Sequence, residues 1–230
     1  EIYKEVDDFS AEVLDGDELL KYVEARRGFF NNPEKTVQKY FVPGEIKEDL
    51  VTYGDFYYHY MAKYSKGYLY KIGHTGYTDG FRQLLEKYSL DPDLLDINWE
   101  NVKEKEATYE TDLVDVLFAM INYEIGKHGY TMFGVNMGFD SIIYFIVKED
   151  SYEKRIKKSY NLFTLFDLEF LENIYNEIYE VTGDLGIEKI KVGDFLEKKE
   201  DGFHTMFKNK ASNIVVTDID ENNEKLMLIL

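Results

Sequence analysis

The sequence predicts an α+β fold in which a mainly antiparallel sheet packs with amphipathic helices. Helical and strand patterns occur in clumps along the chain, which favours α+β over the strict alternation of a doubly wound parallel sheet. Two apolar segments, 130–136 and 141–148, are separated by a short turn at 137–140, as in an antiparallel hairpin. Other segments repeat apolar residues every three or four positions, which is the spacing of an amphipathic helix.

Two helices are predicted near the start of the chain. Asp15 or Asp17 can cap a helix over residues 18–24, which Gly28 would close. Pro33 fits the first position of a second short helix, because its φ is already helical and that position needs no N–H.

The patterns between residues 45 and 93 are mixed. Residues 45–64 are rich in Tyr and Phe and suit a buried helix or a strand, so both alternatives stay open. A strand is predicted over 68–72 and a helix over 81–88, with a glycine-containing loop at 73–80 between them. An Asp-Pro-Asp sequence at 91–93 predicts a turn.

The clearest helix begins at Thr108 or Thr111 and ends at Gly129. Its spacing predicts one apolar and one polar face. The apolar face consists of Leu113, Leu117, Met120 or Ile121, and Ile125. The polar face consists of Asp112, Asp115, Ala119 and Asn122.

The second half of the chain predicts strands and one more helix. Within the predicted strand 141–148, residues 142–147 form a continuous apolar run, so we expect a central strand covered on both faces. Apolar spacing predicts an amphipathic helix over 167–183. The end of the chain predicts two strands, 214–219 and 225–230, around a polar turn at 220–223.

We expect one continuous domain over residues 1–230. Subdivision near 90–98 or 150–165 is the alternative, but neither stretch has the Gly, Ser and Pro content of a linker.

Residue types that hold metals or carry catalysis form no recognisable motif. The absence of Cys excludes disulfides and thiolate metal sites, and the four His lack the paired spacing of common zinc sites. Asp218, Asp220 and Asn222 are spaced like the start of a calcium loop. However, Asn223 and Ile229 stand where an EF-hand needs Gly and Glu, so a polar turn is the better interpretation. We therefore predict no metal and no cofactor, and we assign no catalytic residue.

The loop at 73–80 is a candidate ligand site, with Gly73, His74, Gly76 and Asp79 as its candidate residues. Backbone N–H groups at a helix start can hold a phosphate or carboxylate, and His beside a carboxylate can act as a general base. The loop matches neither the P-loop nor the dinucleotide fingerprint. The alternative is a plain turn whose glycines permit positive φ.

The charge balance says more about partners. The 230-residue chain has 45 Asp and Glu against 27 Lys and Arg, a formal net charge of −18. Such a field repels nucleic acid and anionic lipid and speeds encounters with basic proteins. The segment 91–124 contains ten acidic residues and only two lysines, and it also contains the single Trp. The alternative is that the acids only keep the protein soluble.

An exposed acidic patch carrying aromatic rings would suit a surface that binds a basic protein. The candidate partner-binding residues are Asp91, Asp93, Asp96, Trp99, Glu100, Asp112 and Asp115. The alternative is a solvated face with Trp99 buried.

Three hypotheses about function follow. The first is a non-enzymatic interaction protein, such as an immunity-type inhibitor of a basic toxin. The second is an enzyme or small-ligand binder that uses the 73–80 loop, and the third is a phage-associated or structural subunit. No apolar run approaches the ~20 residues of a bilayer helix, so we expect no membrane insertion and a cytoplasmic protein, although a removed leader would leave no trace here. The residue bias toward Lys, Glu, Asn, Ile and Tyr is typical of AT-rich bacterial or phage genomes. The oligomeric state is not predicted.

Overall fold

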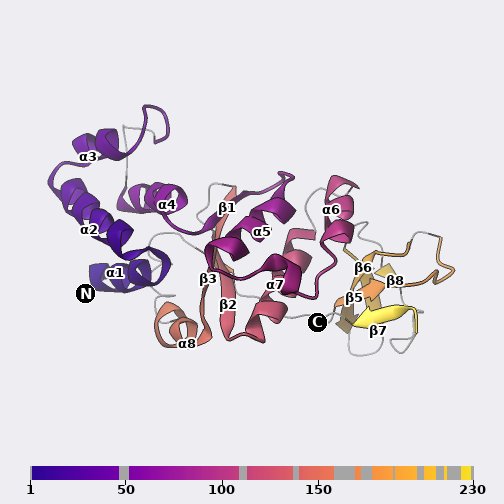
Figure 1. The fold of residues 1–230 in the computed structure, drawn as a ribbon. Coiled ribbons are helices and arrows are strands. Elements are labelled where there is room, and N and C mark those ends of the chain that lie inside the picture. The colour runs from indigo at the N-terminus through magenta and orange to yellow at the C-terminus, as the bar shows by residue number, and fades with distance from the viewer. Residues whose placement is uncertain are drawn as a thin grey trace. The chain divides into compact units, whose positions relative to one another are not determined.

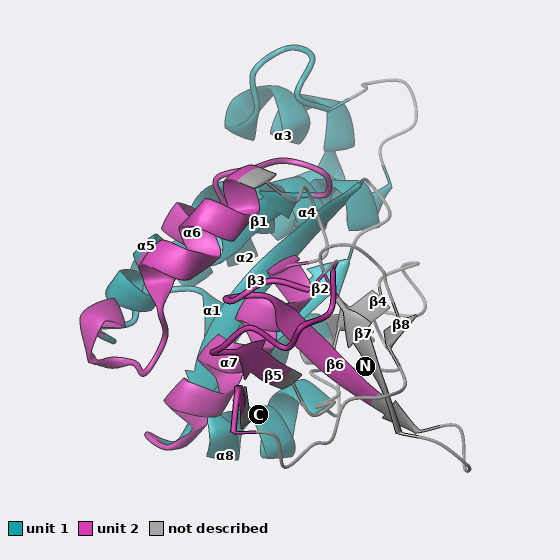
Figure 2. Ribbon diagram, turned by 90° about the vertical axis from the view of Figure 1, so that its right-hand side faces the viewer, with its two compact units in different colours: residues 1–71, 83–90, 129–171 teal, residues 72–82, 91–128, 172–230 magenta. Residues whose placement is uncertain are grey.

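The chain folds into helices and two antiparallel sheets, so the predicted α+β class is confirmed (Figure 1). The structure, a computed structural model, describes residues 2–46, 52–108, 113–136, 140–157, 169–171, 178–188, 190–200, 205–210, 215–216 and 224–228. It divides into two compact units, coloured separately in Figure 2. Unit 1 comprises residues 1–71, 83–90 and 129–171, and unit 2 comprises residues 72–82, 91–128 and 172–230. The single domain expected from the sequence stays a prediction.

Unit 1 is built on a four-stranded antiparallel sheet with the order β1-β3-β2-β4. Its strands are β1 (Tyr68–Lys71), β2 (Tyr130–Asn136), β3 (Ser141–Lys148) and β4 (Glu169–Leu171). The predicted hairpin is confirmed by the β2–β3 pairing, although its turn residues 137–139 lie outside the described residues. Only Lys148 of β3 is exposed, so the expected central strand, covered on both faces, is also confirmed.

One face of this sheet packs against helices in an aromatic core. Phe133 of β2 stacks on Phe145 of β3, and Phe9 meets both rings edge-on. Phe29 stacks on Phe56 at 4.7 Å between ring centroids. Aromatic pairs of these geometries add to the gain from area burial, and they account for much of the chain's aromatic content.

The helices and helical turns that include unit 1 residues are α1 (Ile2–Val13), α2 (Gly16–Asn31), α3 (Pro33–Tyr40), α4 (Tyr53–Tyr64), α5 (Tyr77–Lys87), α8 (Glu149–Ser151) and η3 (Tyr152–Ile156). Asp15 precedes α2 and Pro33 opens α3, as predicted. Gly28 does not close α2, which continues to Asn31. A Cβ at Gly28 would lie 2.8 Å from Thr36 Oγ1, so this glycine instead lets α3 approach α2 closely.

The undecided segment 45–64 contains helix α4. Thr52 accepts a hydrogen bond from the Asp55 N–H at 3.1 Å, and the Asp55 carboxylate accepts one from the Thr52 N–H at 2.9 Å. This reciprocal capping box satisfies two backbone donors at the helix start, which favours the helix over a strand.

Unit 2 contains a five-stranded antiparallel sheet with the order β8-β7-β6-β5-β9. Its strands are β5 (Ile178–Val181), β6 (Phe195–Glu200), β7 (Thr205–Asn209), β8 (Val215–Val216) and β9 (Leu226–Leu228). Its helices, besides the first turns of α5, are η2 (Pro92–Leu94), α6 (Trp99–Thr108) and α7 (Leu113–Gly126). The predicted turn at 91–93 becomes the single turn η2, which Asp91 caps through the Asp93 N–H.

The helix predicted over 167–183 is wrong, because β4 and β5 occupy its described parts. Tyr179 and Val181 are buried while Glu180 between them is less so, and this alternation is the two-residue period of a strand. Tyr179 and Val181 also have the aromatic and β-branched side chains that strands favour. Residues 172–177 lie outside the described residues.

Two further expectations need correction. The strands β8 and β9 lie at opposite edges of their sheet, so they do not form the hairpin predicted around 220–223, whose turn is outside the described residues. The predicted polar face of α7 is also wrong. Of the four residues assigned to it, Ala119 and Asn122 are buried, Asp115 is exposed and Asp112 lies outside the described residues.

Gly67, which precedes β1 in unit 1, offers a test of the close packing against β3. A Cβ at Gly67 would lie 2.6 Å from Ile143 Cγ2 and 2.7 Å from Phe145 Cε1. We expect Gly67→Ala to lower the free energy of unfolding by about 2 kcal/mol through overpacking, measured by urea denaturation with circular dichroism. Gly126→Ala is the matched control, because open space surrounds that position. Equal stability of both variants would contradict the packing described here.

Candidate functional site

The candidate loop of the sequence is shorter than predicted. Helix α5 begins at Tyr77, so Asp79 and Gly80 belong to its first turn, and the connection from β1 consists of residues 72–76. Gly73 and Gly76 have φ values of +82° and +93°, a backbone conformation that favours glycine.

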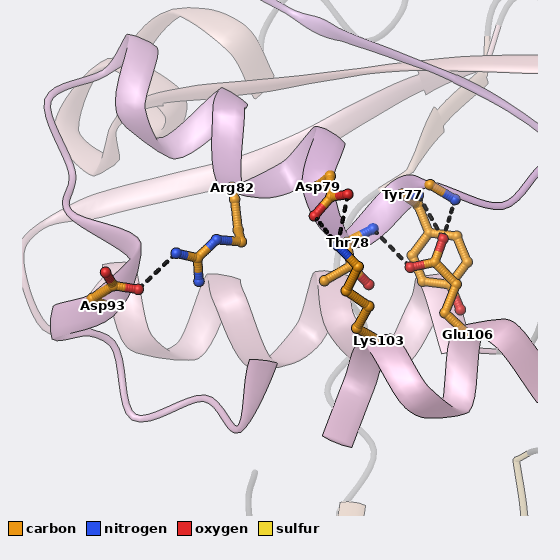
Figure 3. A network of polar contacts seen from close by, with 8 residues as sticks. Tyr77, Thr78, Asp79, Arg82, Asp93, Lys103 and Glu106 are labelled. Carbon is orange, nitrogen blue, oxygen red and sulfur yellow. Dashed lines mark hydrogen bonds and ion pairs between the residues drawn. The ribbon is translucent and has the colours of Figure 1, made fainter. Parts of the chain in front are cut away.

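The start of α5 is held by a carboxylate from α6. Glu106 is buried, and its Oε1 accepts hydrogen bonds from the N–H groups of Gly76 and, at 2.8 Å, Tyr77. Its Oε2 accepts a third from the Thr78 N–H at 3.2 Å (Figure 3). The helix dipole favours an anion at this end. The amides considered for ligand binding therefore donate to the protein's own carboxylate.

A pocket of about 530 Å³ lies beside this cap, between the first turns of α5, η2 and α6. Its lining residues are Thr78, Asp79, Arg82, Asp93, Ile97, Asn98, Trp99, Glu100 and Lys103. All of them belong to unit 2. The volume is within the range of sites that hold small molecules or single side chains.

One wall of the pocket is an arginine on a tryptophan. The Trp99 indole is half-buried, and its Nε1 donates to the Pro92 carbonyl at 2.9 Å. The Arg82 guanidinium carbon lies 5.2 Å from the ring centroid, within cation–π distance. Arg82 Nη2 also donates to Asp93 Oδ1 at 2.7 Å (Figure 3). Because Asp93 is 74% exposed, this ion pair contributes about 0–1 kcal/mol.

A second ion pair in the pocket lining joins a lysine and an aspartate. Lys103 Nζ donates to both oxygens of Asp79, at 2.8 and 2.9 Å. Next to them is Thr78, which is 1% exposed and whose Oγ1 has no hydrogen-bond partner. A buried hydroxyl without a partner is energetically unfavourable, and this one is not accessible from the pocket.

Helix α6 is fixed on its other side to the unit 2 sheet. Lys105 donates to the buried Asp194 at 2.8 Å, and Asn101 donates to Glu180 at 3.0 Å. Burial raises the pKa of the Glu180 carboxyl. The Lys105–Asp194 pair is almost fully removed from water, so breaking it would leave an uncompensated charge.

The structure brings together residues from both predicted site sets. Asp79 of the ligand set shares the pocket with three residues of the partner set, Asp93, Trp99 and Glu100. Gly73, His74 and Gly76 do not line it.

The remaining partner candidates are distributed as follows. Asp91 and Asp96 are exposed on the same stretch of chain, and Asp115 is exposed on α7. Asp112 lies outside the described residues. Two acids counted in the patch, Glu106 and Glu124, are buried instead. Trp99 is neither sealed in the core nor fully exposed.

Sequence reasoning missed the roles of Arg82, Thr78 and Glu106. Glu106 is 28 to 30 residues away from the amides it binds, and no local pattern marks such a contact. The sequence predicts a helix only from residue 81, so the position of Asp79 and Arg82 three residues apart on α5 follows from the structure alone.

Two kinds of feature are absent from the part of the chain that the structure describes. Its His, Asp and Glu residues form no group of three that could hold a metal ion. None of its helices combines the length and apolarity needed to cross a membrane. Comparison with protein-family models, curated proteins and solved structures finds no match in any of the three.

Glu106 gives the sharpest test of the site's architecture. We expect Glu106→Ala to lower the free energy of unfolding of unit 2 by about 3 kcal/mol, because three amides lose a charged acceptor. Glu106→Gln keeps one acceptor oxygen, so it should lower the free energy of unfolding by a smaller amount. Denaturation followed by the fluorescence of Trp99 measures both.

The control for these variants is Glu86→Ala, which removes an exposed carboxylate from α5. It should change the free energy of unfolding by no more than about 0.5 kcal/mol. A Glu106→Ala variant as stable as this control would show that the cap does not hold α5.

Proposed function

We propose that the chain is a non-enzymatic binding protein whose partner is a basic protein. The binding surface would be the segment around the pocket, here named the Trp99 surface. It consists of Asp91, Asp93, Leu94, Asp96, Trp99 and Glu100.

The observation that carries this proposal is the combination of exposed acids with exposed apolar groups in one short segment. The four carboxylates of the Trp99 surface are exposed, and Leu94 between them is 80% exposed. Trp99 presents a half-buried ring next to them. Interfaces commonly combine an aromatic anchor with a polar rim that excludes water.

Electrostatics supports a basic partner over a neutral one. The net charge of −18 attracts cationic proteins over the range of the Debye length, and local carboxylates then set the orientation of the encounter. Arg82 shows that the pocket accommodates a guanidinium against Trp99 and Asp93.

Inhibition of a basic toxin is a concrete form of this function. A nuclease binds phosphates with cationic side chains, and an acidic surface can occupy the same cationic groups. The exposed carboxylates and the Trp99 ring together support this form of the function.

Binding of a small ligand is the second candidate, favoured by the pocket itself. Its volume of about 530 Å³ and its charged lining residues Asp79, Glu100 and Lys103 would suit a small polar molecule. A compound that raises the melting temperature of the wild type but not of Asp79→Asn would support it.

The main proposal is tested by capture and by matched charge variants. The immobilised chain is incubated with extract of the organism that encodes it, at about 50 mM and about 0.5 M salt. We expect a basic protein to be retained at low salt and released at high salt. Calorimetry with the purified partner then gives the affinity.

Two variants with equal charge changes decide whether the Trp99 surface is responsible. The first neutralises Asp91, Asp93, Asp96 and Glu100 to Asn or Gln, and should bind at least about tenfold more weakly. The second neutralises four exposed acids of unit 1, and should bind nearly as the wild type does. These control positions are Asp8, Asp17, Glu34 and Glu149. Retention of no basic protein, or equal binding by the two variants, would overturn the proposal.

A further inference from the structure

We infer that the pocket of the Trp99 surface receives an arginine side chain of the partner, and that Arg82 occupies this position in the unbound protein. The inference rests on the proposed function, and it specifies which side chain of the partner enters the pocket. Arg82 would thus act as an internal competitor that the partner displaces.

The geometry around Arg82 supports a guanidinium as the occupant. Its planar group lies 5.2 Å from the Trp99 ring centroid while one Nη donates to Asp93. Stacking on an aromatic ring together with a carboxylate at the edge is a mode that suits arginine better than lysine, because a guanidinium is flat and carries five fixed donors.

The pocket also has an accessible acceptor for an incoming guanidinium. Glu100, which also lines the pocket, is exposed and forms no ion pair with the described residues. A second guanidinium could therefore gain contacts that Arg82 does not make.

Displacement of Arg82 is feasible because its contacts are weakly held. Asp93 is 74% exposed, so water competes for the ion pair, and the arginine side chain itself is 29% exposed. The balance of charge within the pocket also favours a cation. Asp79, Asp93 and Glu100 outnumber Arg82 and Lys103 by one.

The single Trp of the chain makes the test direct, since any change in its fluorescence reports on this pocket. Two peptide probes are titrated at low salt, namely pentalysine and the same peptide with arginine at its centre. We expect the arginine peptide to change the Trp99 fluorescence saturably and to bind several-fold more tightly than pentalysine.

Removal of the internal competitor should then strengthen binding. We expect Arg82→Gln to bind the arginine peptide about tenfold more tightly, as for a site that is about 90% self-occupied. Arg27→Gln is the matched control, because it makes the same change of residue and charge at an exposed position of unit 1. It should bind as the wild type does. Circular dichroism confirms folding, and Arg82→Ala serves if the Gln variant is unstable.

Two outcomes would overturn the inference. Equal affinities and fluorescence changes for the two peptides would mean that charge alone attracts the partner. Equal affinities of the Arg82 variant and the Arg27 control would mean that Arg82 does not occupy the site. Either result leaves the proposed function intact if the captured basic protein still depends on the Trp99 surface, so the two failures can be told apart.

Discussion

The buried carboxylate of Glu106 is the interaction on which the candidate site depends. It lies on α6 and accepts hydrogen bonds from three successive amides at the start of α5. Those amides would otherwise be unsatisfied, and the carboxylate would otherwise be a buried charge without compensation. Each group is therefore acceptable only because the other is present. This mutual dependence fixes the first turn of α5 against α6, and the pocket is the space between them.

Helix α6 can fix the first turn of α5 because two of its faces bind different parts of unit 2. Trp99, Lys103 and Glu106 are spaced at four and three residues, so they share the face toward α5 and the pocket. Asn101 and Lys105, four residues apart, lie on another face and bind Glu180 of β5 and Asp194, the residue before β6. A helix with polar anchors on two faces has little apolar periodicity, which is why the sequence pattern did not reveal it.

The success of sequence reasoning depended on how local each signal was. The hairpin of β2 and β3 and the start of α3 at Pro33 follow from neighbouring residues, and both were predicted. The segment 178–181 was misassigned because its apolar residues fit a helical stripe as well as an alternating strand, and only pairing within a sheet decides between them. The net charge of a segment includes every acid equally, whereas Glu106 and Glu124 are buried and cannot form part of an exposed patch. Nothing in the sequence separates those two from Asp96 or Glu100.

The same distinction bears on what the acidic charge is for. Acids that serve only solubility need no particular neighbours, yet those of the Trp99 surface surround an aromatic ring and a pocket in which two cations are already paired. The pocket lining has one more acid than bases, and Asp91 and Asp96 of the same segment are exposed without lining it. In the proposed complex, long-range attraction and short-range anchoring would come from different groups: exposed carboxylates such as Asp96 would steer a cationic partner, and the ring of Trp99 would hold it. Salt would weaken the first effect much more than the second, because screening acts on exposed charges and hardly on a stacked, partly desolvated contact.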